Sequence, residues 1–199
     1  MARKLILASG SSIRQTLLHN AGVEFDVVIP RLDEETIKQA LLAEGTKPRD
    51  IADALAEGKA AKVSNKQPED LVLGCDQVLD FAGTLLSKPT TKDDARKQIL
   101  AMRGKTHSLF SAAVIYHEVR PIWRHVGQVR LTMRAFSDKW LNGYLDRNWD
   151  SICNAVGGYK LEQEGVRLFS RIEGDYFNVL GLPLMEILSY LTVSGDLDA

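Results

Sequence analysis

Two charged side chains in the middle of the chain, Asp76 and Lys88, stand out as candidates for chemistry. Asp76 follows the short apolar run of residues 71–73, which is typical of a strand buried on both faces. A carboxylate at the end of such a strand is costly to bury unless it is paired or bound to a metal. The two residues could supply an acid and a base to one site. A capping Asp and a solvated Lys fit the same residues.

A hairpin is predicted to connect these two charged side chains. Residues 78–81 and 84–86 are mostly apolar and flank Ala82 and Gly83, a pair of small residues suited to a turn. Pro89 ends the second arm directly after the Lys. We therefore expect one hairpin to hold both candidates near the same cleft.

A loop of small polar residues, from Ser9 to Ser12, lies between a predicted buried strand at residues 4–8 and a predicted helix at residues 13–20. Unpaired N–H groups and the helix dipole at such a junction favour an anion such as phosphate. Arg14, in the first turn of the helix, could add positive charge. A simple Ser-capped helix is the alternative interpretation of this stretch.

Two more charged residues lie on predicted helices. Glu34 belongs to an acidic run that opens a helix over residues 33–43, where acidic residues also complement the helix dipole. Lys59 lies near the apolar face of the helix that begins at Pro48, where a snorkelling surface Lys is the alternative to a ligand.

Carboxylates combined with Mg²⁺ and with Lys or Arg are typical of phosphoryl and nucleotidyl chemistry. The metal is inferred from these residue types.

The composition is that of an ordinary globular protein with a reduced, cytoplasmic location. Of 199 residues, 45% are hydrophobic and 26% are charged. Because 25 Lys and Arg nearly balance 26 Asp and Glu, no overall field recruits nucleic acid or an anionic membrane. No window is long and apolar enough to span a membrane. Cys75 and Cys153 match no disulfide framework or zinc pattern, and we expect Cys75 to be a core residue.

The order of predicted elements indicates an α/β protein with a mixed sheet. Strands are predicted at residues 25–29, 108–117, 123–136 and 166–172, and helices at residues 90–103, from 137 onward and through 191. The tail from Ser194 is expected to be frayed.

Several short motifs, in order along nearly the whole chain, carry a resemblance to a known family. They are Leu7-Ala8-Ser9-Gly10-Ser11-Ser12-Ile13-Arg14, Asp33-Glu34, Leu55-Ala56-Glu57-Gly58-Lys59-Ala60, Gly74-Cys75-Asp76-Gln77-Val78, Lys88-Pro89 and Gly181-Leu182-Pro183-Leu184. Together they resemble the Maf-like nucleoside triphosphate pyrophosphatases. Ser12 stands where the family usually has Pro.

The resemblance implies a fold and an activity. The expected fold is a single domain over residues 1–199, with a mixed, strongly bent β-sheet and flanking helices around a central cleft. The expected reaction is hydrolysis between the α- and β-phosphates of a nucleotide, which gives a nucleoside monophosphate and pyrophosphate. A divalent cation, Mg²⁺ or alternatively Mn²⁺, would be the cofactor. The partner would be a nucleotide substrate, with no nucleic acid or membrane; a homodimer is left open.

The resemblance also implies roles for individual residues. Asp76 would be catalytic and would hold the metal together with Glu34. The phosphates would be bound by Ser9, Arg14, Lys59 and Lys88.

Three residues are expected to set the base specificity: Ile13, Gln77 and Glu162. At these positions the thymidine- and uridine-type members have Arg, Thr and Gln, and the residues present are similar to the subgroup that acts on 7-methyl-GTP. The resemblance therefore implies removal of a modified nucleotide. A dTTP/UTP pyrophosphatase of the same family and a non-catalytic nucleotide-binding regulator of cell division are the alternatives.

Overall fold

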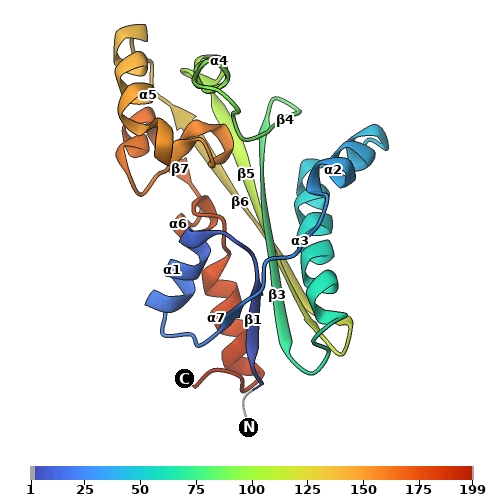
Figure 1. Cartoon of the computed structure of the whole chain (residues 1–199). Helices are drawn as coiled ribbons and strands as arrows, with labels where there is room; N and C mark the ends of the chain where they lie inside the picture. Colours follow the sequence, from blue (N-terminus) through green and yellow to red (C-terminus); the bar gives the residue numbers. More distant parts are fainter. Residues whose placement is uncertain (1–2, 199) are drawn as a thin grey trace. The chain divides into compact units, whose positions relative to one another are not determined.

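In the computed structural model, which describes residues 3–198, seven strands form one mixed β-sheet (Figure 1). The strand order is β2-β1-β3-β5-β6-β7, and β4 pairs with β3. β1 runs parallel to β2 and β3, whereas β4 and β7 run antiparallel to β3 and β6. The strands are β1 (Leu5–Ala8), β2 (Asp26–Val27), β3 (Leu71–Phe81), β4 (Thr84–Leu86), β5 (Thr106–His117), β6 (Arg120–Met133) and β7 (Phe169–Glu173). The expected mixed α/β sheet is confirmed.

Most helices begin where the sequence supplies a start signal. Asp33 caps α2 by accepting a hydrogen bond from the Thr36 N–H, and Pro48 is the first residue of α3. Thr91 and Asp94 form a reciprocal capping box at α4. The helices are α1 (Ser12–Asn20), α2 (Glu34–Ala43), α3 (Pro48–Ser64), α4 (Lys92–Met102), α5 (Asp138–Ile152), α6 (Tyr176–Val179) and α7 (Leu184–Val193), with 3₁₀ turns η1 (Val156–Gly158) and η2 (Glu164–Leu168).

The described chain divides into two compact units. The first contains residues 3–77, 110–127 and 175–198, and the second contains residues 78–109 and 128–174. Because β3, β5 and β6 each cross a boundary between these segments, both units share these strands. The single domain expected from the sequence stays a prediction. No helix within residues 3–198 is long and apolar enough to cross a membrane.

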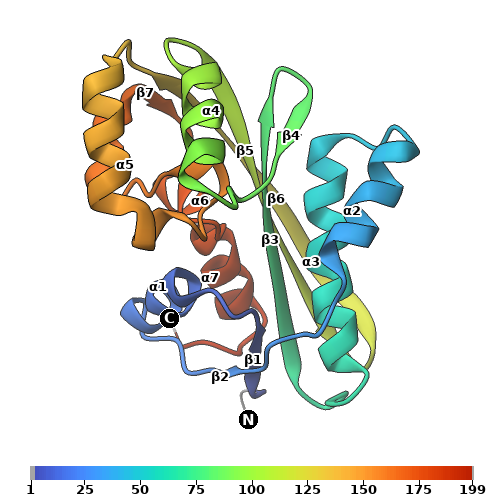
Figure 2. The ribbon, with the colours of Figure 1, turned by 45° about the horizontal axis from the view of Figure 1, so that its top comes forward.

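The first unit is built on β1 and the first half of β3. In Figures 1 and 2, α1 and α7 lie on one side of these strands and α3 lies on the other. The core between the strands, α1 and α7 contains buried apolar side chains such as Leu7, Leu18, Leu73 and Ile187. β1 and the first half of β3 are buried on both faces, which explains their continuous apolar runs.

The second unit contains the predicted hairpin and a separate group of helices. β3 and β4 pair with Leu79 opposite Leu86, which confirms the predicted hairpin, and the turn residues Ala82 and Gly83 both have positive φ. α4 packs beside α5 (Figure 2), where Arg96 and Arg103 both form ion pairs with Asp138.

Three predictions differ from the structure. In the predicted strand 25–29, only Asp26 and Val27 pair with β1, and both are exposed at the edge of the sheet. In the predicted strand 166–172, residues 166–168 instead belong to η2. There Gly165 packs so closely on the Lys160 backbone that a Cβ would lie 2.4 Å from its carbonyl oxygen.

The third difference concerns the chain end, which was expected to be frayed. Arg3 donates from its backbone and its guanidinium to Asp196, with Nη2 2.5 Å from Oδ2, so this part of the tail is tied to the first unit.

Candidate functional site

Lys59 bridges two carboxylates in the first unit. Its Nζ atom lies 2.6 Å from Asp76 Oδ1 and 2.9 Å from Glu34 Oε2. The side chains of Lys59 and Asp76 are 8% and 10% exposed, whereas Glu34 is 47% exposed. The structure therefore brings together three of the residues that the sequence singled out. Lys59 is a buried member of this cluster rather than a snorkelling surface residue.

A glycine allows α3 to approach β3 closely enough to form this cluster. A Cβ at Gly74 would lie 2.2 Å from the Ala56 carbonyl oxygen and 2.7 Å from the Ala60 nitrogen, so only glycine fits between the strand and the helix. Lys59 lies on the same helix between these contacts, and Asp76 is two residues beyond Gly74 on the strand. The close approach therefore places the ammonium group against the carboxylate.

Burial decides the electrostatics of Asp76. Loss of solvent raises the pKa of its carboxyl above the ordinary value, while the positive charges of Lys59 and Arg14 act in the opposite direction. A carboxylate whose pKa is raised is better matched to proton transfer near neutral pH than an exposed one. Burial also raises the pKa of the neighbouring Cys75 thiol to about 11, so this residue is an unreactive core residue, as expected from the sequence.

Arg14 joins α1 to the strand that carries Asp76. Its Nε atom donates to the Gly181 carbonyl at 2.8 Å, and its Nη1 atom donates to the Cys75 carbonyl at 3.0 Å and to Ser9 Oγ at 3.2 Å. Ser9 and Arg14 are both buried and in contact, and their binding of phosphate stays a prediction. Ser11 occupies the N-cap position of α1 without a side-chain capping bond, so the alternative of a simple Ser-capped helix is not supported.

Gln77 is hydrogen-bonded to a part of the site that the sequence did not single out. Its Nε2 atom donates to Ser111 Oγ at 2.9 Å and to the carbonyls of Asn178 and Val179 at 2.9 and 3.1 Å. Ser111 and Asn178 are buried. Ser111 and Asn178 lie 34 and 101 positions from Gln77 in the sequence, so no local pattern could predict this network.

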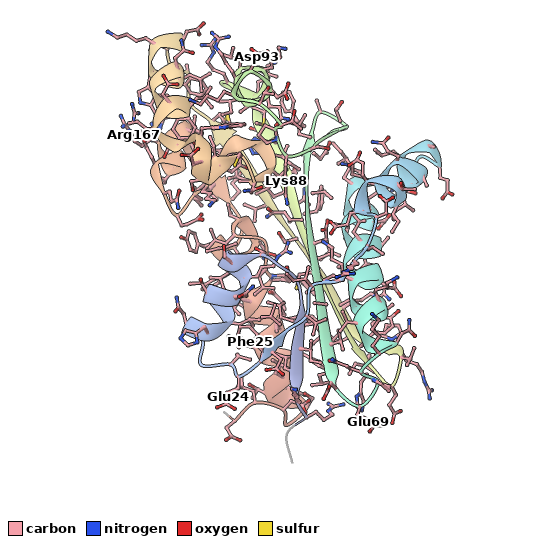
Figure 3. All side chains as sticks on the ribbon, viewed as in Figure 1. Glu24, Phe25, Glu69, Lys88, Asp93 and Arg167 are labelled. Atoms are coloured by element: carbon pink, nitrogen blue, oxygen red, sulfur yellow. The ribbon has the colours of Figure 1, made fainter. Side chains whose placement is uncertain are left out.

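The other predicted residues take no part in the ion pairs of Lys59. Ile13 is partly buried and packs on the core of the first unit. Lys88, labelled in Figure 3, and Glu162 belong to the second unit and are exposed. Neither forms an ion pair within residues 3–198, so both charges are available to a ligand.

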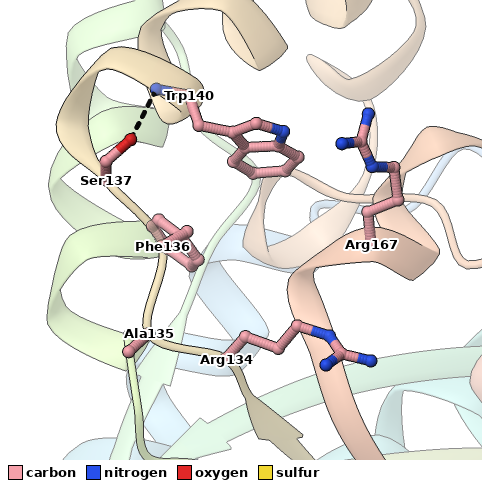
Figure 4. A pocket seen from close by; sticks show the side chains of 6 residues that line it. All are labelled: Arg134, Ala135, Phe136, Ser137, Trp140 and Arg167. Atoms are coloured by element: carbon pink, nitrogen blue, oxygen red, sulfur yellow. Dashed lines mark hydrogen bonds between the residues drawn. The ribbon is translucent and has the colours of Figure 1, made fainter.

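A pocket of about 460 Å³ lies in the second unit but contains none of the predicted site residues. Figure 4 shows its lining, in which the Arg167 guanidinium lies over the Trp140 ring at 5.4 Å and Ser137 Oγ accepts from the Trp140 backbone N–H. No carboxylate lines this pocket. It therefore offers no base for activating water.

Comparison with known proteins identifies the family. The profile described as Maf-like protein matches residues 4–193. The chain belongs to the Maf-like protein family. This Maf-like protein is 62% identical over the full length of both chains to a protein named nucleoside triphosphate pyrophosphatase from Ruegeria sp. (strain TM1040). It is 63% identical, again over both full lengths, to one of the same name from Ruegeria pomeroyi. It is 41% identical over both full lengths to one named 7-methyl-GTP pyrophosphatase from Mesorhizobium japonicum.

The carboxylates of this Maf-like protein suit a metal that shares its coordination with a substrate. Within residues 3–198 there is no group of three or more His, Cys, Asp or Glu side chains that could hold a metal ion without other ligands. Mg²⁺ commonly binds one or two protein carboxylates and completes its shell with water and phosphate oxygens. Glu34 and Asp76 are the two carboxylates that contact Lys59, and they are the residues that could act as such ligands.

Proposed function

We propose that this chain is a nucleoside triphosphate pyrophosphatase that cleaves between the α- and β-phosphates and releases a monophosphate and pyrophosphate. The observation that carries the proposal is the cluster in which the buried Lys59 bridges the buried Asp76 and the exposed Glu34. The two Ruegeria relatives, whose names give this activity, support it.

The charge of each proposed site residue determines its role in the reaction. Water must lose a proton and attack phosphorus in line while the negative charge of the triphosphate is neutralised. Asp76 is the group that takes the proton and orients the water. Lys59 and Lys88 bind phosphate oxygens, and Ser9 and Arg14 hold the anion at the start of α1. Lys59 changes partners on substrate binding, because its ammonium group is occupied by carboxylates when no phosphate is present.

A divalent cation, Mg²⁺ or Mn²⁺, belongs to this proposal. Glu34 and Asp76 would hold it, and when bound it would offset the repulsion between carboxylates and triphosphate. Hydrolysis should therefore stop in excess chelator and return when Mg²⁺ is added. A Glu34→Gln variant should need a higher Mg²⁺ concentration for half-maximal rate. Undiminished hydrolysis in chelator would contradict the metal requirement.

The proposed substrate is 7-methyl-GTP. The Mesorhizobium relative is named for this activity, and Ile13, Gln77 and Glu162 are the residues we assign to the base. Methylation at N7 gives the base a delocalised positive charge, which a carboxylate at position 162 would stabilise while it accepts hydrogen bonds from the base. Glu162 is exposed and forms no ion pair within the described chain, so its carboxylate is free for this role.

One experiment tests the activity and the substrate together. The protein is incubated with Mg²⁺ and a panel containing 7-methyl-GTP, GTP, UTP and dTTP, and both monophosphate and pyrophosphate are assayed. We expect equal amounts of both products and the highest kcat/KM for 7-methyl-GTP. A preference for UTP or dTTP would keep the activity and overturn the substrate. Binding of nucleotides without turnover would instead support the non-catalytic regulator.

A further inference from the structure

The Asn178 backbone carbonyl joins β3 to β5 within the first unit. It accepts a hydrogen bond from Gln77 Nε2 at 2.9 Å and another from Ser111 Oγ at 2.6 Å. Gln77 Nε2 also donates to the Val179 carbonyl, and Ser111 Oγ accepts from Gln77. The Gly181 backbone N–H donates to the same carbonyl at 3.1 Å, so three donors converge on it.

The segment that carries this carbonyl is itself held rigidly. Asp175 Oδ2 accepts from both the backbone N–H and the side-chain Nδ2 of Asn178, each at 3.0 Å. The Asn178 Oδ1 atom has no hydrogen-bond partner within the described chain. It packs against Gly127 on β6 so closely that a Cβ at that position would lie 2.1 Å from it. The segment is therefore fixed against β6 as well.

A second connection reaches the same segment from α1. Arg14 donates to the Gly181 carbonyl and to the Cys75 carbonyl. The residues immediately before and after Asp76 are thus both tied to residues 178–181. Successive side chains of a strand point to opposite faces, so the Asp76 carboxylate is directed away from these bonds and toward Lys59 on α3.

We propose that Gln77 is a positioning residue that holds Asp76 against Lys59 by tying β3 to residues 178–181. The inference rests on the proposed function, in which Asp76 activates water. Gln77 acts through the neighbouring backbone, since its Nε2 atom is occupied by three acceptors within the unit. Loss of these bonds would let β3 shift, and displacements of about 1 Å in a reacting group can cost roughly 100-fold in rate.

The test compares two substitutions that keep the size of the side chain. Gln77→Met removes both amide hydrogens and with them the contacts to all three acceptors, and Gln77→Glu places a carboxylate opposite two carbonyl oxygens. For both variants we expect kcat to fall by about 10- to 100-fold while KM changes much less.

Gln128→Met is the matched control. Gln128 also lies on a strand and donates to a serine, Ser108, but this pair is exposed and in the second unit. This variant should behave as wild type. A normal kcat in Gln77→Met would overturn the proposal. A changed substrate ratio with an unchanged kcat on the best substrate would also overturn it, because Gln77 would then act on the base alone and not on the position of Asp76.

A measurement without turnover separates this inference from the proposed function. Amide hydrogen exchange in residues 71–81 and 175–181 should be at least several-fold faster in Gln77→Met than in wild type or Gln128→Met. Unchanged exchange would overturn the positioning role even if nucleotides are hydrolysed. If the wild-type protein hydrolysed no nucleotide, the proposed function would fail, and the exchange rates alone would decide whether Gln77 holds β3 to this segment.

Discussion

Lys59 and Asp76 form a buried ion pair, with Nζ 2.6 Å from Oδ1, between a helix and a strand that meet only because residue 74 is glycine. Removing one partner of such a pair leaves a charge that is buried without compensation. Mutations at this pair therefore affect both stability and chemistry, and the two effects must be measured separately.

The Asp76→Asn variant should retain its fold and lose its activity. Asn keeps the size of the side chain and can still accept a hydrogen bond from Lys59, but it cannot take a proton from water. We expect kcat to fall on the order of 10²- to 10⁴-fold, the usual contribution of a general base. Steady-state kinetics and thermal unfolding check this. Asp146→Asn, at an exposed ion pair in the second unit, is the control, and near-normal turnover in Asp76→Asn would show that another group is the base.

Lys59→Ala and Lys88→Ala should lower kcat/KM similarly but differ in stability. Loss of a charged contact to phosphate costs roughly 1.5–3 kcal/mol, or about 10- to 100-fold in kcat/KM. Lys59→Ala should also lower the free energy of unfolding by about 3–5 kcal/mol, because it leaves Asp76 buried without its ion pair. Lys88 is exposed, so its removal should leave stability unchanged.

The control for both lysine variants is Lys47→Ala, at an exposed position before α3. Urea unfolding and kinetics on the same preparations separate the two effects. Equal kinetics in all three variants would mean that the phosphate-binding residues are wrongly assigned.

Glu162→Gln should change substrate preference rather than overall turnover. The neutral amide loses the charge that stabilises the cationic base, so kcat/KM for 7-methyl-GTP should fall by about 10- to 100-fold, as for a lost charged hydrogen bond. Turnover of UTP and dTTP should hold or improve, because their bases are neutral. Competition assays with paired substrates measure this ratio. A variant that loses all substrates equally, or none, would place the specificity elsewhere.

The stability of the second unit should depend on pH through His107. Burial lowers the pKa of His107 to about 4 from an ordinary value of 6.5, while its Nε2 atom is 2.7 Å from the Tyr159 hydroxyl. Between these two pH values the unfolded chain binds a proton that the folded chain does not. Unfolding free energy should therefore fall as pH drops below about 6.5, by about 2 kcal/mol at pH 5.

Urea unfolding at pH 8 and pH 5 measures this loss. His107→Gln can still hydrogen-bond to Tyr159 but does not titrate, so it should lose less stability between the two pH values. His19→Gln, at an exposed position, should behave as wild type. An equal loss in wild type and His107→Gln would assign the pH dependence to other groups.

Local features of the sequence determined where most elements begin and end. These features act through the φ angles and hydrogen bonds of a few neighbouring residues. Examples are the turn at Ala82 and Gly83, the helix cap at Asp33 and the first helical position at Pro48. The motif residues Asp76, Lys59 and Glu34 were likewise identified from the sequence as site candidates.

Only the tertiary structure decided which charges meet and what they bond to. Lys59 was equally compatible with a solvated surface until the approach of α3 to Gly74 placed it on Asp76. The contacts of Gln77 with Ser111 and Asn178 join residues 34 and 101 positions apart, which no local pattern records. A short polar side chain has many potential partners along the chain, and burial selects the ones that leave the fewest polar groups unsatisfied.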